Sequence, residues 1–224
     1  MEEGNGTLPM EADDDVDTKG DIKLFIHSSP VFKKGAIKRL AIRNFLTFGE
    51  TQPGPSSRKA PAPLYFYFEP SINIISGPNG FGKSSIVNAI ALCCGSRAKF
   101  LRRGNVYGDL VKRGAGIDRA EIELTLHNPD HPKGQTRFAR TIYRQSKNER
   151  TPNNEFFING KPKKFHEYRA RLKEEFRIVP ENLSLFLLQD RIADLFDLKP
   201  FELLKCAEQS VPAPPPSLRR GFAA

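Results

Sequence analysis

The chain has 224 residues, 38% of them hydrophobic, which suffices for one large domain or two small ones with a buried core. No run approaches the roughly 18–20 consecutive apolar residues that span a membrane, so a membrane partner is not expected. The acidic N-terminus has no basic region followed by an apolar segment, so we expect no secretory signal.

The formal net charge of +9 conceals an asymmetry along the chain. Residues 1–21 hold eight acids against one lysine, a charge of −7, which leaves +16 for the remainder. This strongly positive charge outside residues 1–21 favours a polyanionic partner such as DNA. The alternative is a solvated basic surface that the acidic segment partly neutralises.

The N-terminal third of the chain predicts a tail, two strands and a loop. Residues 1–35 are mostly polar and aperiodic, and we expect a disordered acidic tail. Residues 36–48 alternate apolar and basic, which predicts a strand. Residues 49–63 hold four prolines, typical of a loop insertion, and residues 64–68 predict the next strand. The candidates for burial in the first strand are Ile37, Leu40, Ile42, Phe45 and Phe48.

A glycine-rich turn follows at Gly77-x-x-x-x-Gly82-Lys83-Ser84, the phosphate-binding loop pattern. Residues 72–75 predict a short strand before it, and a helix from Lys83 is expected to end near Gly95. The glycines let backbone N–H groups surround phosphate oxygens, and the helix N-terminus adds its positive dipole end. Lys83 is expected on the β- and γ-phosphates and the Ser84 hydroxyl on Mg²⁺. A chance glycine-rich turn is the alternative.

The middle of the chain predicts an antiparallel meander. It begins after a basic patch of Arg97, Lys99, Arg102 and Arg103. Strands are expected at 120–126, 136–145 and 155–160, the last closed by an Asn-Gly hairpin signal, and an amphipathic helix at 165–176. Cys93, Cys94 and Cys206 have no metal-ligand spacing and predict buried thiols in a reducing compartment.

An apolar strand over 183–190 is expected to end in Gln189 and Asp190. Asp190 fits a Walker B acid that holds Mg²⁺, although Arg191 follows where a second acid is expected. Gln189 at a strand end also fits a residue that faces the metal and the attacking water. Asp190 as a helix N-cap is the third reading, and spacing leaves all three open. A short helix through Ile192 and Phe196 and a helix from Pro200 to Ser210 are expected next, before a disordered Pro-rich tail at 212–224.

The quoted motifs together resemble the SMC/Rad50-like branch of ABC ATPases. Gly77–Ser85 resembles its phosphate loop, Ile42–Phe48 its first strand and Leu183–Asp190 its Gln-loop, which favours Gln189 over Asp190. The resemblance is closer to one eukaryotic branch of this family, through the segments Val111–Gly114, Ala120–Leu124 and Pro200–Leu204. The similarity covers about residues 37–211.

The resemblance implies an α/β fold, the N-terminal lobe of a P-loop ATPase head, over residues 36–211. It implies ATP and Mg²⁺ as cofactors, metal contacts from Ser84 and Gln189, and catalytic roles for Lys83, Gln189 and a cis arginine. That arginine is Arg102 or, one residue on, Arg103. The implied phosphate contacts are Gly77, Pro78, Asn79, Gly80, Phe81, Gly82, Lys83, Ser84 and Ser85.

The resemblance also implies partners: a second head of the same family, non-SMC subunits, and DNA in double-strand break repair by homologous recombination in the nucleus. The chain departs from the family in having no Ser-Gly-Gly signature and no Walker B acid. We therefore expect an inactive fragment whose last residues, 212–224, are a read-through or mis-spliced end. A self-contained NTPase or phosphotransferase and a non-catalytic, basic DNA-binding module are the alternatives.

Overall fold

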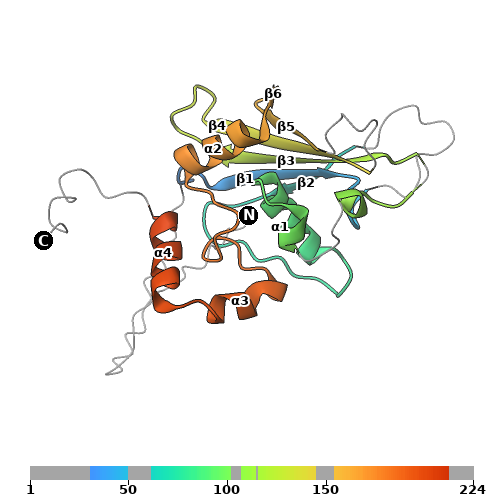
Figure 1. The fold of residues 1–224 in the computed structure, drawn as a ribbon. Coiled ribbons are helices and arrows are strands. Elements are labelled where there is room, and N and C mark those ends of the chain that lie inside the picture. Colours follow the sequence, from blue (N-terminus) through green and yellow to red (C-terminus); the bar gives the residue numbers. More distant parts are fainter. Residues whose placement is uncertain (1–30, 50–61, 102–106, 115, 145–153, 212–224) are drawn as a thin grey trace, which may run out of the picture.

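The computed structural model describes residues 31–49, 62–101, 107–114, 116–144 and 154–211 (Figure 1). Our expectations for residues 1–30, for most of the Pro-rich insertion, for Arg102 and Arg103 and for the 212–224 tail therefore lie outside the described residues. The described part is a mixed α/β fold with one antiparallel sheet, as the sequence predicted.

Six strands form the sheet, in the order β2-β1-β3-β4-β5-β6, all neighbours antiparallel. The predicted meander is confirmed, because β3, β4, β5 and β6 follow one another in chain and sheet. Asn159 and Gly160, both at positive φ, form the β5–β6 turn, as Asn-Gly predicted. The strands are β1 Ile37–Arg43, β2 Leu64–Tyr67, β3 Arg119–His127, β4 Gln135–Tyr143, β5 Asn154–Ile158 and β6 Lys161–Lys163.

Alternation along the strands divides the sheet into two faces. On β3, Ala120, Ile122, Leu124 and Leu126 are buried beneath the helices. The intervening Glu121 and Glu123 lie on the other face and pair with arginines of β1, Glu121 with Arg43 at 2.8 Å and Glu123 with Arg39 at 2.7 Å. One face of the sheet therefore forms the core, and the other face carries paired charged side chains.

Two helices cover the apolar face (Figure 1). Helix α1, Lys83–Cys93, packs on β3 and β4 and ends, as expected, near Gly95, whose φ is +93°. Helix α2, Phe165–Phe176, packs on β5 and buries Tyr168, Leu172 and Phe176, which lie four residues apart on one side. Short 3₁₀ segments, Ala98–Leu101 and Tyr107–Leu110, connect α1 to β3.

Two predicted strands are wrong. Residues 72–75 have no regular secondary structure and no ladder partners, and Ile72 and Ile74 are 71% and 87% exposed. Residues 183–188 form turns and coil, with Leu183 and Leu188 buried and Leu187 half exposed. A strand needs a neighbour for its backbone N–H and C=O groups, and no described segment pairs with either run. An α/β ATPase lobe of the kind the resemblance implies would place the phosphate-loop helix on a core sheet with the meander beside it; in the structure, α1 packs on the meander strands β3 and β4.

The C-terminal part forms three short helical segments: a 3₁₀ turn at Gln189–Arg191, α3 at Ile192–Phe196 and α4 at Pro200–Ser210. Pro200 opens α4 as expected, and Glu202 accepts a hydrogen bond from the Lys199 N–H at 3.0 Å. The third reading of Asp190 is not supported, because Arg191, and not Asp190, precedes α3.

Candidate phosphate-binding site

The glycine-rich loop leads directly into α1, in the arrangement that a phosphate site requires. Residues 76–80 are exposed, and α1 begins at Lys83. The Lys83 ammonium donates hydrogen bonds to the carbonyl oxygens of Gly77 at 2.5 Å and Pro78 at 2.9 Å. The cation therefore lies over the loop, where phosphate oxygens would meet it.

The N-terminus of α1 is open to an anion. Its N-cap residue, Gly82, has no side chain to accept a hydrogen bond from the first-turn N–H groups, and the first turn holds no acid. These N–H groups and the helix dipole favour a bound anion. Ser84 is exposed at this end, whereas Ser85 is buried at 3% exposure. The residues present thus fit the phosphates of a nucleotide.

Gly82 is held against the segment that follows β1. Its φ is +91°, and a Cβ there would lie 2.6 Å from Phe48 Cζ and 2.7 Å from Thr47 Oγ1. Phe48 in turn packs edge-on against Phe66 of β2, with ring centroids 5.6 Å apart. The strand pattern predicts Phe48 only as a core residue and gives no sign of this support of the loop. No pattern indicated it, since residues 48 and 82 are distant in the chain.

The other predicted catalytic residues are not placed around the loop by any described contact. Gln189 opens the 3₁₀ turn with an exposed side chain. Arg102 and Arg103 lie outside the described residues. Among the described residues, no group of three His, Cys, Asp or Glu side chains gathers as a metal site. A metal held by a hydroxyl and phosphates requires no such cluster.

A buried arginine anchors the other end of α1. Arg140 on β4 is 1% exposed and donates from Nη1 to the carbonyls of Leu92 at 2.8 Å and Ser96 at 2.7 Å. Its Nε donates to Asn154 Oδ1 at 3.0 Å. Burial lowers the pKa of Arg140. The cation satisfies carbonyls at the helix C-terminus, where the dipole favours positive charge.

Arg140 was not among the predicted site residues, although the sequence holds a signal for it. In the alternation of β4, Thr136, Phe138, Arg140 and Ile142 all point inward, so one charged residue occupies a core position. A buried charge requires partners. The guanidinium also lies over the rings of Tyr107 and Phe156, 4.9 and 5.0 Å from their centroids.

Cys93, the last residue of α1, is buried in the core at the same end of the helix. Its thiol lies 3.1 Å from the Phe138 carbonyl oxygen, and the Tyr168 hydroxyl donates to the Cys93 carbonyl. Burial raises the pKa of the Cys93 thiol from 9.0 to about 12. The expected buried thiols are confirmed for Cys93 and Cys94, while Cys206 on α4 is half-buried. Among the described helices, none has the length and apolarity to cross a bilayer.

The fold and the loop together define the N-terminal lobe of an SMC-type ATPase head. The chain belongs to the RecF/RecN/SMC N terminal domain family, whose model matches residues 36–185. The chain is 33% identical over 183 residues to structural maintenance of chromosomes protein 5 of Arabidopsis thaliana. The matched region covers 82% of this chain and 15% of that protein. The chain therefore spans about 15% of the length of this relative.

Solved SMC heads share the fold. The Smc head domain of Pyrococcus yayanosii, with a coiled coil and joint, superposes with a TM-score of 0.62 at 22% identity over 77% of this chain and 31% of that chain. A structure from work on ATP-driven dimerization and DNA stimulated activation of SMC ATPases gives 0.60 at 20% identity, over 78% of this chain and 99% of that chain. The expected fold class and family are confirmed.

Proposed function

We propose that this chain is the ATP-binding part of an SMC head and resembles structural maintenance of chromosomes protein 5. One observation carries the proposal: the uncapped N-terminus of α1 behind an exposed glycine loop, with the Lys83 ammonium over it. Two sources of positive charge, the lysine ammonium and the free N–H groups at the positive end of the helix dipole, converge on one position.

Each loop residue has a role in this proposal. Gly77, Pro78, Asn79, Gly80, Phe81 and Gly82 supply the backbone that surrounds the phosphates. Lys83 exchanges its two loop carbonyls for β- and γ-phosphate oxygens, and Ser84 and Gln189 hold Mg²⁺. Bound Mg²⁺ supplies charge that stabilises the transferring phosphoryl group. Arg102 is proposed as the cis arginine near the γ-phosphate.

Exposed apolar side chains on several segments fit contact with a second lobe supplied by the rest of a longer protein. Large hydrophobic side chains stand exposed in both segments that failed to form strands and on α3 and α4. Exposed apolar area on this scale indicates a surface that another structure covers. The most exposed are Ile72, Ile74, Phe196 and Phe201, between 71% and 87%.

The whole-protein role is proposed from the relatives. In it, ATP joins this head to that of structural maintenance of chromosomes protein 6, with non-SMC subunits, and the complex holds DNA in the nucleus during double-strand break repair and chromosome maintenance. The charge of +16 outside residues 1–21 supports the DNA contact. Because the signature and Walker B motifs are missing from this chain, turnover requires the other lobe.

Binding of a fluorescent ATP analogue to the purified chain tests the proposal. We expect Mg²⁺-dependent binding that Lys83→Ala weakens at least tenfold, while Lys205→Ala, at an exposed position on α4, leaves it unchanged. We expect no turnover. Equal binding by both variants would contradict the phosphate site. Turnover that Lys83→Ala abolishes would instead indicate a self-contained NTPase.

A labelled oligonucleotide tests the DNA contact separately. We expect binding that weakens steeply as salt rises, because each phosphate contact releases counterions. Salt-dependent binding without any nucleotide site would favour the basic DNA-binding module. No binding at low salt would contradict the DNA contact and leave the nucleotide site untouched.

A further inference from the structure

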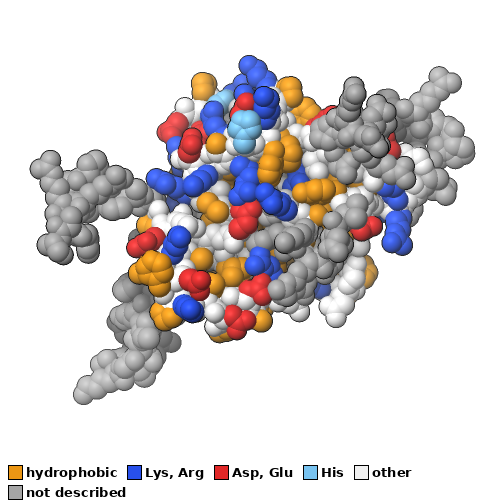
Figure 2. Space-filling model, in the orientation of Figure 1, with side chains coloured by type: hydrophobic (Ala, Val, Ile, Leu, Met, Phe, Trp, Pro, Cys, Tyr) orange, Lys and Arg blue, Asp and Glu red, His pale blue; other side chains and the backbone are white. Residues whose placement is uncertain are grey.

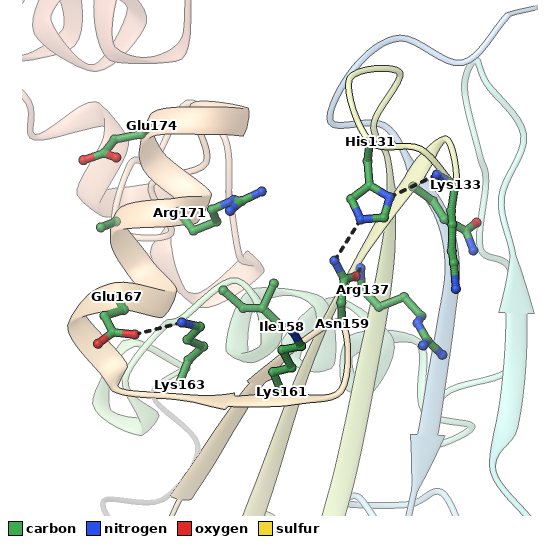
Figure 3. Close-up of a pocket in the computed structure, with 12 residues that line it drawn as sticks. His131, Lys133, Arg137, Ile158, Asn159, Lys161, Lys163, Glu167, Arg171 and Glu174 are labelled. Carbon is green, nitrogen blue, oxygen red and sulfur yellow. Dashed lines mark hydrogen bonds and ion pairs between the residues drawn. The ribbon is translucent and has the colours of Figure 1, made fainter.

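A basic hollow lies between the end of the sheet and α2, away from the phosphate loop (Figure 3). Its volume is about 920 Å³. One wall is the β3–β4 turn with His131 and Lys133, the floor is β6 and the other wall is α2 (Figure 3). The cations that line it are Lys133, Arg137, Lys161, Lys163 and Arg171. Blue side chains also gather at this end of the molecule in the space-filling view (Figure 2).

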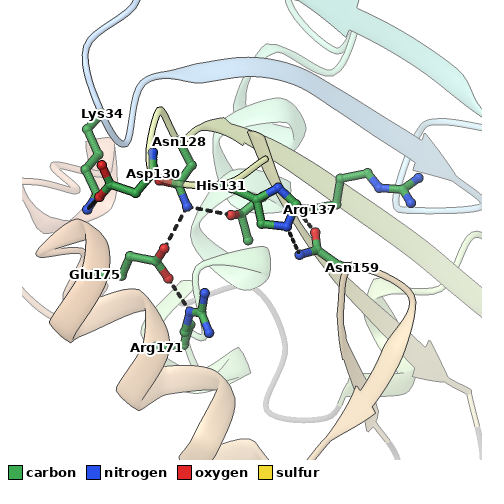
Figure 4. A network of polar contacts seen from close by, with 9 residues as sticks. Lys34, Asn128, Asp130, His131, Arg137, Asn159, Arg171 and Glu175 are labelled. Carbon is green, nitrogen blue, oxygen red and sulfur yellow. Dashed lines mark hydrogen bonds and ion pairs between the residues drawn. The ribbon is translucent and has the colours of Figure 1, made fainter. Parts of the chain in front are cut away.

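Polar contacts hold the walls of the hollow in place (Figure 4). Asn128 donates from Nδ2 to Thr136 at 2.9 Å and to Glu175 of α2 at 2.6 Å, which ties the turn to the helix. The His131 Nε2 lies 3.4 Å from Asn159 Nδ2 in the β5–β6 turn. The cations therefore project from a frame whose two turns and helix are connected.

The charges in the hollow are only partly balanced. Lys163 pairs with Glu167 at 3.3 Å, and Arg171 pairs with Glu175. Lys133 and Lys161 have no acid within ion-pair distance among the described residues. The hollow thus offers cations to an anionic ligand, while Glu167 and Glu174 remain on its α2 wall.

The chain from the N-terminus joins the fold beside this hollow. The Gly35 N–H donates to the His127 carbonyl at 2.9 Å, and the ring of Phe32 lies 6.0 Å from that of His127. Lys34 pairs with Asp130 in the β3–β4 turn, next to His131 of the hollow (Figure 4). Residues 22–30 link this point to the acidic segment, and nine extended residues span up to about 30 Å. The segment can therefore reach the hollow.

We propose that the acidic segment, residues 1–21, binds in this basic hollow of its own molecule and excludes other polyanions from it. The segment carries −7 and the hollow an excess of cations. Attachment to the same chain gives the segment a high effective concentration. The two glutamates of the α2 wall disfavour a uniform phosphate backbone, whereas the segment includes Lys19 among its acids. An acidic peptide therefore matches the hollow better than a nucleic acid does.

Carbodiimide cross-linking of the full chain tests the contact, since the reagent joins lysine to Asp or Glu at contact distance. We expect cross-links from Lys133 to acids of residues 11–21, with a yield independent of protein concentration. Lys161→Glu with Lys163→Glu should lower that yield several-fold. Lys199→Glu with Lys205→Glu, the same charge change around α4, should leave it unchanged. Equal yields in both double variants, or no such cross-links, would overturn the proposal.

A second measurement separates the acidic segment from a nucleic acid as occupant. Replacing Asp13, Asp14, Asp15 and Asp17 by Asn removes four negative charges from the segment. We expect this variant to bind a labelled single-stranded oligonucleotide several-fold more tightly, with the gain lost when Lys161→Glu and Lys163→Glu are added. Oligonucleotide binding that depends on Lys161 and Lys163 but not on the four aspartates would show a nucleic-acid site and refute the proposal. Circular dichroism confirms that each variant is folded.

Discussion

Arg140 should be the most costly single charge to remove from this fold. Replacing it by Met keeps an unbranched side chain, although a shorter one, and removes the donors to Leu92, Ser96 and Asn154. Both carbonyls at the end of α1 then lose a charged donor, and among the described residues only that of Leu92 keeps a backbone donor, the Gly95 N–H at 2.9 Å. Hydrogen bonds to charged groups contribute about 1.5–3 kcal/mol each, and an orphaned buried acceptor costs about 1–3 kcal/mol.

Opposing terms reduce that sum. Burial of the guanidinium itself costs free energy, which is the reason that burial lowers its pKa. Methionine also recovers part of the packing against Phe156. We therefore expect Arg140→Met to lower the free energy of unfolding by about 2–4 kcal/mol, less than the sum of the three lost charge-assisted hydrogen bonds. Arg140→Lys should cost less, since it keeps the charge and loses only the planar fork.

Urea denaturation followed by circular dichroism measures the effect. The matched control is Arg137→Met on the same strand, whose side chain is 45% exposed and lies 4.0 Å from Glu123 on the outer face. We expect that control to change stability by less than about 0.5 kcal/mol. A loss below about 1 kcal/mol for Arg140→Met, or equal losses in both variants, would refute the assigned role of the buried charge.

Three further predictions concern the loop, the thiol and the apolar surface. Gly82→Ala should destabilise the chain by about 1–3 kcal/mol more than Gly80→Ala. Both residues have positive φ, but only at position 82 does a Cβ meet Phe48, so equal denaturation midpoints would contradict the clash. The raised pKa of Cys93 means that its stabilisation is complete below pH 9.0 and is lost as the pH rises towards about 12. Stability measured across that window should fall less steeply in Cys93→Ala, and an unchanged slope would rule out this thiol as a cause. Phe201→Ser, at a position 75% exposed, should raise solubility without lowering the unfolding midpoint, and a lowered midpoint would show that Phe201 packs.

Predictions from local pattern succeeded where neighbouring strands follow each other in the chain. The β3–β4–β5–β6 meander was legible because each strand alternates and each connection carries a turn signal, such as Asn159-Gly160. Residues 72–75 and 183–188 are apolar runs of the same kind, yet neither forms a strand. Their hydrophobicity predicted strands, but a ladder also requires an adjacent backbone, and no described segment provides one.

The sequence by itself determined the phosphate loop, the helix behind it and the family, because these depend on residues that are contiguous in the chain. Glycine at 77 and 82, Lys83 and Ser84 predict phosphate binding by residue type and spacing alone. Only the tertiary structure decided what holds that loop: Phe48 beneath Gly82 at one end of α1 and Arg140 at the other. These contacts join segments 34 and 48 residues apart, counted from Gly82 to Phe48 and from Leu92 to Arg140. No local periodicity encodes such distances, so the support of the site became visible only in the fold.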